Sequence, residues 1–234
     1  MVIIKGIEKL TLIDYPGHIA SILFLGGCNF RCDYCYNKDL VLRPHEMPTI
    51  SQDIALEFIN ERRNFIDAVV VTGGEPTLQI NSLLSFLPQL KSLGLKIKLD
   101  SNGYFPDRLE QLVKTGTIDY IAMDIKAPLS RYSEIVGAEI VAEKISQSVS
   151  FIMNSSVDYE FRTTVWQNSF TQKEFESMFQ MIQGAKNYYL QNMYPCFTIQ
   201  PKNMYHSVKL AEIQPIVDLA KSYVGHVALR GEWV

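Results

Sequence analysis

Residues 67–76 have the sequence DAVVVTGGEP, a short apolar run followed directly by a glycine turn. The β-branched run 67–71 favours a buried strand, and Gly73 and Gly74 end it. Downstream, four leucines recur at the three- and four-residue spacing of one helix face, namely Leu83, Leu84, Leu87 and Leu90. A strand, a turn and an amphipathic helix in this order form the repeating unit of a parallel α/β sheet.

The same unit recurs on both sides of this stretch. Further strands are predicted at 19–25, 95–99, 119–123, 159–166, 187–191 and 224–229. The other predicted helices cover 51–63, a segment ending near Thr115, 139–153, a segment that Thr171 and Glu174 begin with a capping box, and 210–223. About six or seven β-α units fit, fewer than the eight of a complete barrel. The predicted fold is therefore α/β with a mostly parallel sheet, a partial (β/α)6-type TIM barrel.

Composition narrows the class of protein. The chain has 234 residues, 47% hydrophobic and 20% charged, with a formal net charge of −3. These proportions exclude a disordered polyelectrolyte and a fibrous repeat. The slight negative charge gives no global basic field, so we expect no nucleic-acid partner. Because no repeat or Pro/Gly-rich linker interrupts the pattern, we expect a single domain over 1–234.

Compartment is indicated by the N-terminus and the thiols. Lys5, Glu8 and Lys9 interrupt the apolar residues at the start of the chain, which is unlike a signal peptide. No apolar run approaches the roughly 18 residues of a membrane span. Four cysteines are too few for a disulfide framework at this length. We expect a soluble cytoplasmic protein with reduced thiols and no membrane partner.

Polar motifs follow four of the predicted strands at the points where these strands end. They are the cysteine loop after 19–25, the turn 73–76, the segment 100–103 and the segment 124–126. Loops after the carboxyl ends of parallel strands gather on one face of the sheet. The sequence therefore predicts that all four motifs lie at one mouth.

The cysteine loop spaces Cys28, Cys32 and Cys35 as C-x3-C-x2-C. Thiolates this close on one loop suit a soft metal centre, either zinc or an iron–sulfur cluster. A zinc site would need a fourth ligand from Cys196 or from one of the histidines, His18, His45, His206 and His226. Structural zinc usually comes with a second knuckle, which the sequence lacks, so the cluster is favoured. Cys196 has no partner cysteine nearby, and we expect a buried thiol there.

In their order and spacing, these motifs resemble those of the radical S-adenosylmethionine superfamily, and most closely its glycyl-radical-enzyme activases. The cysteine spacing comes first, with an aromatic residue before Cys35. It is followed by GGEP at 73–76, DSNG at 100–103 and DIK at 124–126. The resemblance implies a radical SAM core in which three cysteines hold a 4Fe-4S cluster with one open iron. That iron would bind S-adenosylmethionine, and reductive cleavage of this cofactor would give a 5′-deoxyadenosyl radical.

The resemblance also implies the cofactor-binding residues. The methionine amino group would lie at Gly73, Gly74 and Glu75, and Tyr34 would face adenine. Asp100 and Asp124 would lie near the methionine end, directly or through a monovalent cation. Ser101 and Asn102 would lie near the ribose. Lys126 would lie near the carboxylate, and Arg162 would face the cofactor. By residue type alone, a simple tight turn, a surface Asp/Lys pair, a structural arginine and an aromatic shield remain alternatives.

The reaction is suggested by the leader KLTLIDYPG at 9–17 and by FLGGCNFRC at 24–32. Both look like the activating proteins of anaerobic ribonucleoside-triphosphate reductase; pyruvate formate-lyase activating enzymes belong to the same class of activases. The resemblance implies a glycyl radical enzyme as partner and a flavodoxin or ferredoxin-type electron donor. Tyr36 departs from the histidine usual after the third cysteine, which puts the particular partner in question. A radical enzyme acting on a small molecule or RNA, and a non-catalytic zinc-binding α/β protein, are the alternatives.

Overall fold

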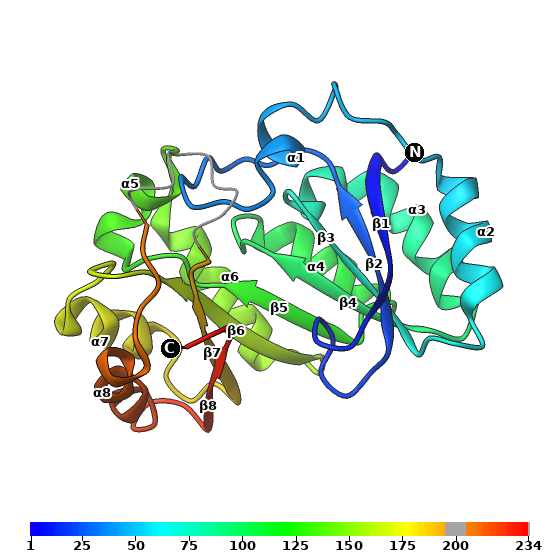
Figure 1. Cartoon of the computed structure of the whole chain (residues 1–234). Coiled ribbons are helices and arrows are strands. Elements are labelled where there is room, and N and C mark those ends of the chain that lie inside the picture. Colours follow the sequence, from blue (N-terminus) through cyan, green and yellow to red (C-terminus); the bar gives the residue numbers. More distant parts are fainter. Residues whose placement is uncertain (195–204, 234) are drawn as a thin grey trace.

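A computed structural model describes residues 1–194 and 205–233. One sheet of eight strands runs in chain order (Figure 1). Its first pair is antiparallel, and every later pair is parallel. The strands are β1 (Ile4–Thr11), β2 (Ala20–Leu25), β3 (Ala68–Gly73), β4 (Lys96–Ser101), β5 (Tyr120–Asp124), β6 (Asp158–Val165), β7 (Asn187–Asn192) and β8 (His226–Arg230). The predicted mostly parallel α/β sheet is confirmed.

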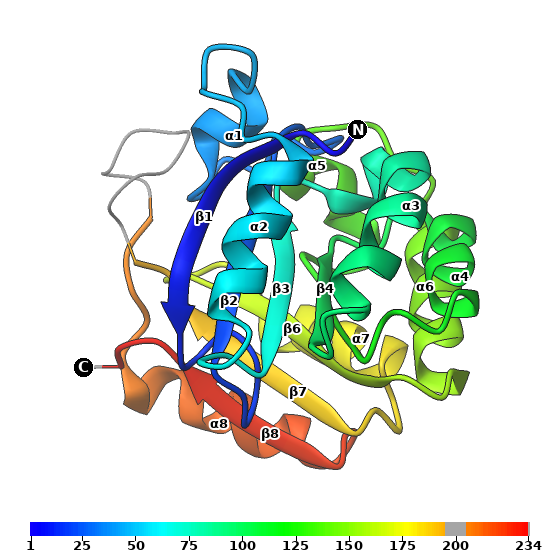
Figure 2. The ribbon, with the colours of Figure 1, turned by 90° about the vertical axis from the view of Figure 1, so that its right-hand side faces the viewer.

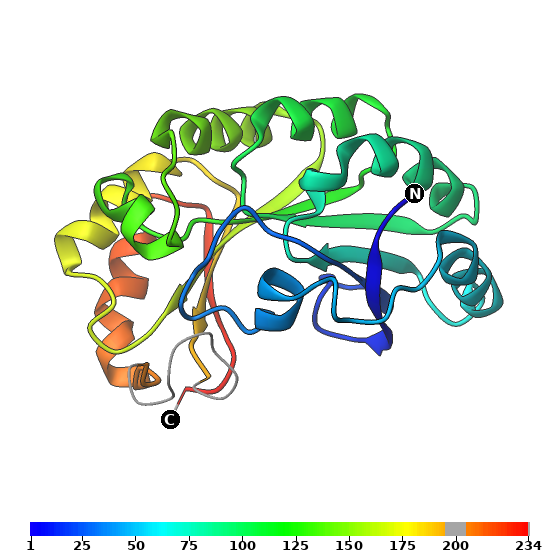
Figure 3. The ribbon, with the colours of Figure 1, turned by 90° about the horizontal axis from the view of Figure 1, so that it is seen from above.

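Helices cover the convex side of the curved sheet, as the view from above shows (Figure 3). The longer ones are α2 (Gln52–Arg62), α3 (Ile80–Lys91), α4 (Pro106–Lys114), α6 (Ala142–Asn154), α7 (Gln172–Met181) and α8 (Leu210–Ala220). Each lies within a few residues of its predicted position, and the capping box of Thr171 and Glu174 is present. Shorter elements are α1 (Lys38–Leu42), α5 (Tyr132–Val136) and the 3-10 turns η1 (Pro76–Gln79) and η2 (Leu129–Arg131).

Alternation along each strand gives the sheet two different faces. On β4, Ile97 and Leu99 are fully buried in the large apolar core under the helices. Their neighbours Lys98 and Asp100 are ion-paired to each other on the opposite, concave face. Successive side chains of a strand point to opposite sides, so one strand serves both environments. We call the helix-covered side the outer face and the concave side the inner face.

Strand β1 was not among the predicted strands. Its burial falls from Ile4, which is fully buried, to Glu8 and Lys9, which are exposed. An edge strand with one solvated side tolerates such charges, and the charges hide its periodicity in the sequence. Figure 2 shows β1 and β8 as the two end strands of the sheet. Neither pairs with the other among the described residues, so the barrel is partial.

Register brings the carboxyl ends of the parallel strands together. Leu25 pairs with Gly73, Ser101 with Met123, and Asp124 with Arg162. The cysteine loop and the three polar motifs therefore emerge from the same edge, as predicted. A single domain over 1–234 stays a prediction, supported by the continuity of this sheet. In the described part of the chain, no helix has the length and apolar character needed to cross a membrane.

Candidate active site

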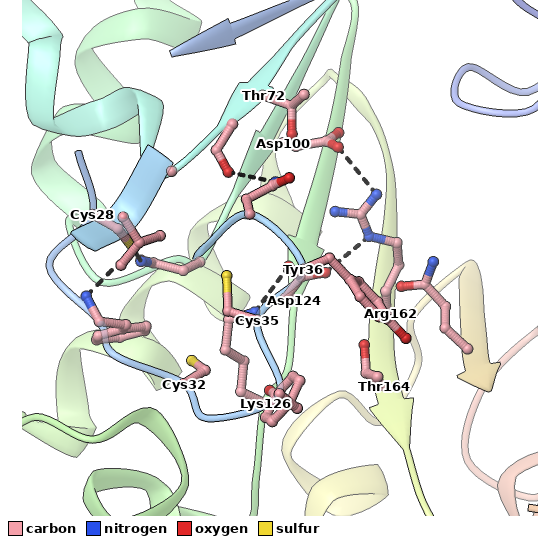
Figure 4. Close-up of a pocket in the computed structure, with 18 of the residues that line it drawn as sticks. Cys28, Cys32, Cys35, Tyr36, Thr72, Asp100, Asp124, Lys126, Arg162 and Thr164 are labelled. Carbon is pink, nitrogen blue, oxygen red and sulfur yellow. Dashed lines mark hydrogen bonds and ion pairs between the residues drawn. The ribbon is translucent and has the colours of Figure 1, made fainter. Parts of the chain in front are cut away.

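A cavity of about 370 Å³ opens at the carboxyl edge of the sheet. This volume lies within the range of small-molecule sites. Its wall includes all three predicted metal-binding cysteines and strand-end residues from β3 to β8 (Figure 4). Of the predicted site residues, the wall contains Cys28, Cys32, Cys35, Tyr34, Gly73, Gly74, Asp100, Ser101, Asn102, Asp124, Lys126 and Arg162. The structure thus brings together residues from Cys28 to Arg162, which lie 134 positions apart in the sequence.

The cysteine loop is anchored by backbone hydrogen bonds to neighbouring segments. Gly27 N donates to Leu40 O of α1 at 2.8 Å, and Arg31 N donates to Val136 O of α5 at 2.7 Å. The Arg31 guanidinium also donates to the carbonyls of Cys28 and Phe30, both at 2.7 Å. Both short helices, which the sequence did not predict, therefore support the loop.

Gly73 and Gly74 let the end of β3 cross the start of the cysteine loop. A Cβ on Gly74 would lie 1.9 Å from Gly27 O, and one on Gly73, whose φ is +120°, would lie 2.4 Å from Leu25 N. Gly74 N donates to Leu25 O at 2.8 Å across this crossing. The sequence suggested that glycine admits a ligand here; the close approach in the structure is to protein backbone.

Glu75 is fully buried and does not line the cavity wall. Its carboxylate accepts from Thr77 N at 3.0 Å, Ser101 Oγ at 3.0 Å and Asn102 N at 2.7 Å. Burial raises its pKa even though these hydrogen bonds act in the opposite direction. Glu75 therefore ties the turn after β3 to the segment after β4, which is how it could position both.

Charged side chains of β4, β5 and β6 form a continuous network on the inner face. Arg162 Nε lies 2.9 Å from Asp124 Oδ1, and its Nη1 lies 3.2 Å from Asp100 Oδ2. Lys98 Nζ contacts Asp100 Oδ1 at 2.6 Å, and Lys126 Nζ contacts Asp124 Oδ2 at 3.1 Å. Figure 4 shows Arg162 between the two aspartates. Such an array of opposite charges suits a zwitterionic ligand.

The network keeps its carboxylates ionised. Burial alone would raise the pKa of Asp124, but Arg162 and Lys126 outweigh burial and lower it to about 2. Arg162 and Lys98 likewise lower the pKa of Asp100 despite its burial. For Lys126, the Asp124 charge outweighs burial and holds the pKa well above its usual value. None of these groups exchanges a proton near neutral pH. The network is therefore suited to binding charged groups of a ligand rather than to transferring protons.

The three thiols are largely shielded from solvent. Burial, followed by the charge of Glu75, raises the pKa of Cys28 to about 12, and burial raises that of Cys32 to about 11. The pKa of Cys35 is also raised by burial. Within residues 1–194 and 205–233, no group of three or more His, Cys, Asp or Glu side chains is arranged to hold a single metal ion.

Aromatic residues of the cysteine loop line part of the cavity. Tyr34 is buried and packs on Trp166 with ring centroids 4.9 Å apart, while Lys126 Nζ lies 5.9 Å from its ring centre. Tyr36 also lines the cavity, and its hydroxyl donates to Met193 Sδ at 3.1 Å and accepts from Tyr194 N at 2.5 Å. The position after the third cysteine thus links the loop to the end of β7. Cys196, predicted as a buried thiol, lies outside the described residues.

Several inner-face residues were missed by the sequence analysis. Glu160 is fully buried and accepts from the Arg230 guanidinium at 2.6 and 2.7 Å and from Tyr120 Oη at 2.9 Å. The sequence held a signal for Glu160 and Lys98. Each lies two residues before a predicted site residue of the same strand, Arg162 or Asp100, and therefore shares its face of the sheet. Arg230, on the last strand, carried no such signal.

The residues fit the cofactors that the sequence suggested. Three cysteine sulfurs from one loop face one cavity, which is the donor set of an iron–sulfur centre. Asn29 Nδ2, one residue after Cys28, is buried without a hydrogen-bond partner among the described residues and is a donor of the kind that cluster sulfurs accept. The charged network beside the cysteines suits the amino and carboxylate groups of an amino-acid cofactor.

Fold and site together are those of a partial-barrel enzyme whose three cysteines, at the carboxyl edge of the sheet, could hold a redox centre. Comparison with protein families gives the particular group: the chain belongs to the Radical SAM superfamily, which matches residues 22–181. The predictions of a radical SAM fold and enzyme are confirmed. Membership implies a 4Fe-4S cluster and S-adenosylmethionine as cofactors.

Curated relatives include activating enzymes. A protein of Methanocaldococcus jannaschii, named provisionally as a glycyl-radical enzyme activating enzyme, is 29% identical over 97% of this chain and 95% of its own length. The pyruvate formate-lyase-activating enzyme of Listeria monocytogenes is 33% identical over 53% of this chain and 52% of its own length. The chain thus spans the first relative almost completely and matches about half of the second.

Solved structures share the fold. SuiB of Streptococcus suis, bound to S-adenosylmethionine, gives a TM-score of 0.65 at 14% identity over 90% of this chain and 52% of that chain. TYW1 with a lysine-pyruvate adduct bound gives 0.63 at 15% identity over 87% of this chain and 73% of that chain. At these identities the likeness concerns the architecture alone.

Proposed function

We propose that this chain is a radical SAM activase that installs a glycyl radical on a partner enzyme. The observation that carries the proposal is the match to the Methanocaldococcus jannaschii relative, which covers 97% of this chain and 95% of that protein. The cavity supports it, because cysteines and a zwitterion-binding network line the same space. We propose that the enzyme acts in the cytoplasm, where thiols stay reduced.

In this proposal each part of the wall has its own task. Cys28, Cys32 and Cys35 hold three irons of the cluster. When bound, the cluster and S-adenosylmethionine supply the one-electron chemistry that removes a hydrogen atom from the substrate. Lys126 and Arg162 bind the carboxylate end of the cofactor, and Asp100 and Asp124 its amino end. Gly73, Gly74, Ser101 and Tyr34 shape the remaining wall around the cofactor.

A monovalent cation beside the two aspartates is not needed for this arrangement. Each carboxylate oxygen of Asp100 and Asp124 already contacts a basic side chain, from Lys98, Lys126 or Arg162. We propose that these three residues supply the positive charge for which the family resemblance offered a bound cation as one possibility.

The remaining wall suits a protein backbone. Thr72, Thr164 and Gln191 line the cavity, are uncharged, and make no side-chain hydrogen bonds to other described residues. Their free donors and acceptors can pair with the amides of an extended segment. We propose that an extended, glycine-bearing loop of a large partner pairs with this part of the wall.

The partner that we propose is an anaerobic ribonucleotide reductase-like glycyl radical enzyme, with a flavodoxin or ferredoxin-type electron donor. This choice rests on the leader at 9–17, whose Asp14 lines the cavity. Tyr36, in place of the usual histidine, leaves the choice among glycyl radical enzymes to experiment.

Anaerobic reconstitution followed by electron paramagnetic resonance tests the proposal. We expect about four irons per chain, 5′-deoxyadenosine after reduction, and a glycyl doublet when a candidate partner is added. A partner whose target glycine is replaced by alanine is the matched control and should give no doublet. Turnover on a metabolite or RNA, with silence across all partners, would refute the activase function. One bound zinc with no nucleoside product would refute radical chemistry altogether.

A further inference from the structure

Asn102 directly follows β4, and its side chain contacts the cysteine loop in a fixed amide orientation. Its Oδ1 accepts from Tyr104 N at 3.0 Å, and its Nδ2 donates to Asn29 Oδ1 at 2.9 Å. Turning the amide over would set its NH2 group against the Tyr104 N–H, donor against donor. The backbone is fixed as well, because Asn102 N donates to Glu75 Oε2 at 2.7 Å.

One N–H of this amide remains after the bond to Asn29. Nδ2 lies 3.9 Å from Cys28 Sγ, within reach of a long hydrogen bond to sulfur. The same sulfur accepts from Phe30 N at 3.4 Å. Cys28 is therefore the one cysteine, among the described residues, whose sulfur contacts a side-chain amide donor as well as a backbone donor.

We propose that Asn102 is a positioning residue for the cluster, donating to the Cys28 sulfur, and that Asn29 and Glu75 hold it there. Hydrogen bonds to cluster sulfurs stabilise the more negative, reduced state and so raise the reduction potential. Sequence resemblance placed Asn102 at the ribose of the cofactor. In the structure its amide is committed to Tyr104, Asn29 and Cys28, which leaves a single lone pair on Oδ1 for any other partner.

The proposal rests on cluster binding by Cys28 but not on the identity of the partner enzyme. Its test is a potentiometric titration of the reconstituted cluster without S-adenosylmethionine or partner, followed by electron paramagnetic resonance. Failure to activate any glycyl radical enzyme would leave this measurement unaffected, so the two proposals fail separately.

We expect Asn102→Ala to shift the potential to a more negative value than in the wild-type protein. Asn102→Asp keeps the shape and the acceptor for Tyr104 but replaces the donor with a charge, so its shift should be larger. Asn29→Ala, which frees the Asn102 amide and also removes the unpartnered Asn29 Nδ2 donor, should shift the potential in the same direction. Ser92→Ala, at the exposed end of α3 and outside the cavity, is the control and should leave the potential unchanged.

Two results would overturn the proposal. An unchanged potential in Asn102→Ala, with weaker binding of S-adenosylmethionine, would return Asn102 to the ribose. Loss of iron in both Asn102 variants and in Asn29→Ala would show that Asn102 and Asn29 only maintain the structure of the cysteine loop.

Discussion

The outer and inner faces of β4, β5 and β6 are built from alternating residues of the same strands, yet they differ completely. The outer face is apolar and fully buried, with Leu99, Met123 and Phe161 under the helices. The inner face is charged, with Asp100, Asp124 and Arg162 joined in one network around the cavity. Outer residues stabilise the barrel through burial, and inner residues present charge to the cavity, where we propose that they bind the cofactor. Neighbouring substitutions should therefore affect stability and function separately.

The largest expected effect concerns function without stability. Cys35→Ala removes one of the three proposed cluster ligands from a half-buried loop position, so we expect cluster assembly and 5′-deoxyadenosine formation to be lost entirely. The unfolding free energy of the metal-free protein should change by less than about 1 kcal/mol. Iron analysis and urea unfolding measure the two quantities. A four-iron cluster in this variant would contradict the ligand assignment.

The outer face should show the reverse behaviour. Phe161 is fully buried beside Arg162, and Phe161→Ala should lower the unfolding free energy by about 3–5 kcal/mol because it leaves a cavity. Urea unfolding of the metal-free protein is the measurement, with Phe161→Leu as the smaller change. If Phe161→Ala cost less than about 1 kcal/mol, the outer face would not be the main source of stability.

One inner-face pair should behave like the outer face, because its loss should lower stability. Arg230→Met leaves the buried Glu160 carboxylate without its two closest donors, which should cost about 3 kcal/mol. The double variant Glu160→Gln/Arg230→Met removes the uncompensated charge and should recover much of this loss. Equal stabilities of the single and double variants would show that the pair contributes nothing through charge.

The smallest effect is a pH dependence. The pKa of Asp124 falls from 3.8 to about 2 on folding, so its ionisation stabilises the folded state fully above about pH 4, and this stabilisation is lost as the pH falls through 2. A fall in pKa of this size corresponds to roughly 2.5 kcal/mol. The stability difference between wild type and Asp124→Asn should shrink by about that amount between pH 5 and pH 2. A constant difference would mean that Asp124 is not stabilised by its basic neighbours.

Local sequence signals predicted the parallel strands and the mouth of the barrel well. Each parallel strand has an apolar run bounded by turn residues, and the polar motifs sit where those runs end. The signals failed where structure depends on distant partners. Strand β1 depends on pairing with β2, and Arg230 depends on Glu160, 70 residues away. Glu75 was predicted at the cofactor, but only the fold shows that its oxygens are used by Thr77, Ser101 and Asn102.

Because the sheet has two end strands, its strands should differ in how easily their backbone hydrogen bonds open. Among the described residues, β1 and β8 each have one strand neighbour, whereas β4 and β5 each have two and carry fully buried side chains. Backbone amides that are paired on one side only, near solvent, exchange through smaller fluctuations. Hydrogen–deuterium exchange should therefore proceed from the two ends of the sheet toward its centre. The strands that carry Asp100 and Asp124 should then keep their register while the two end strands exchange.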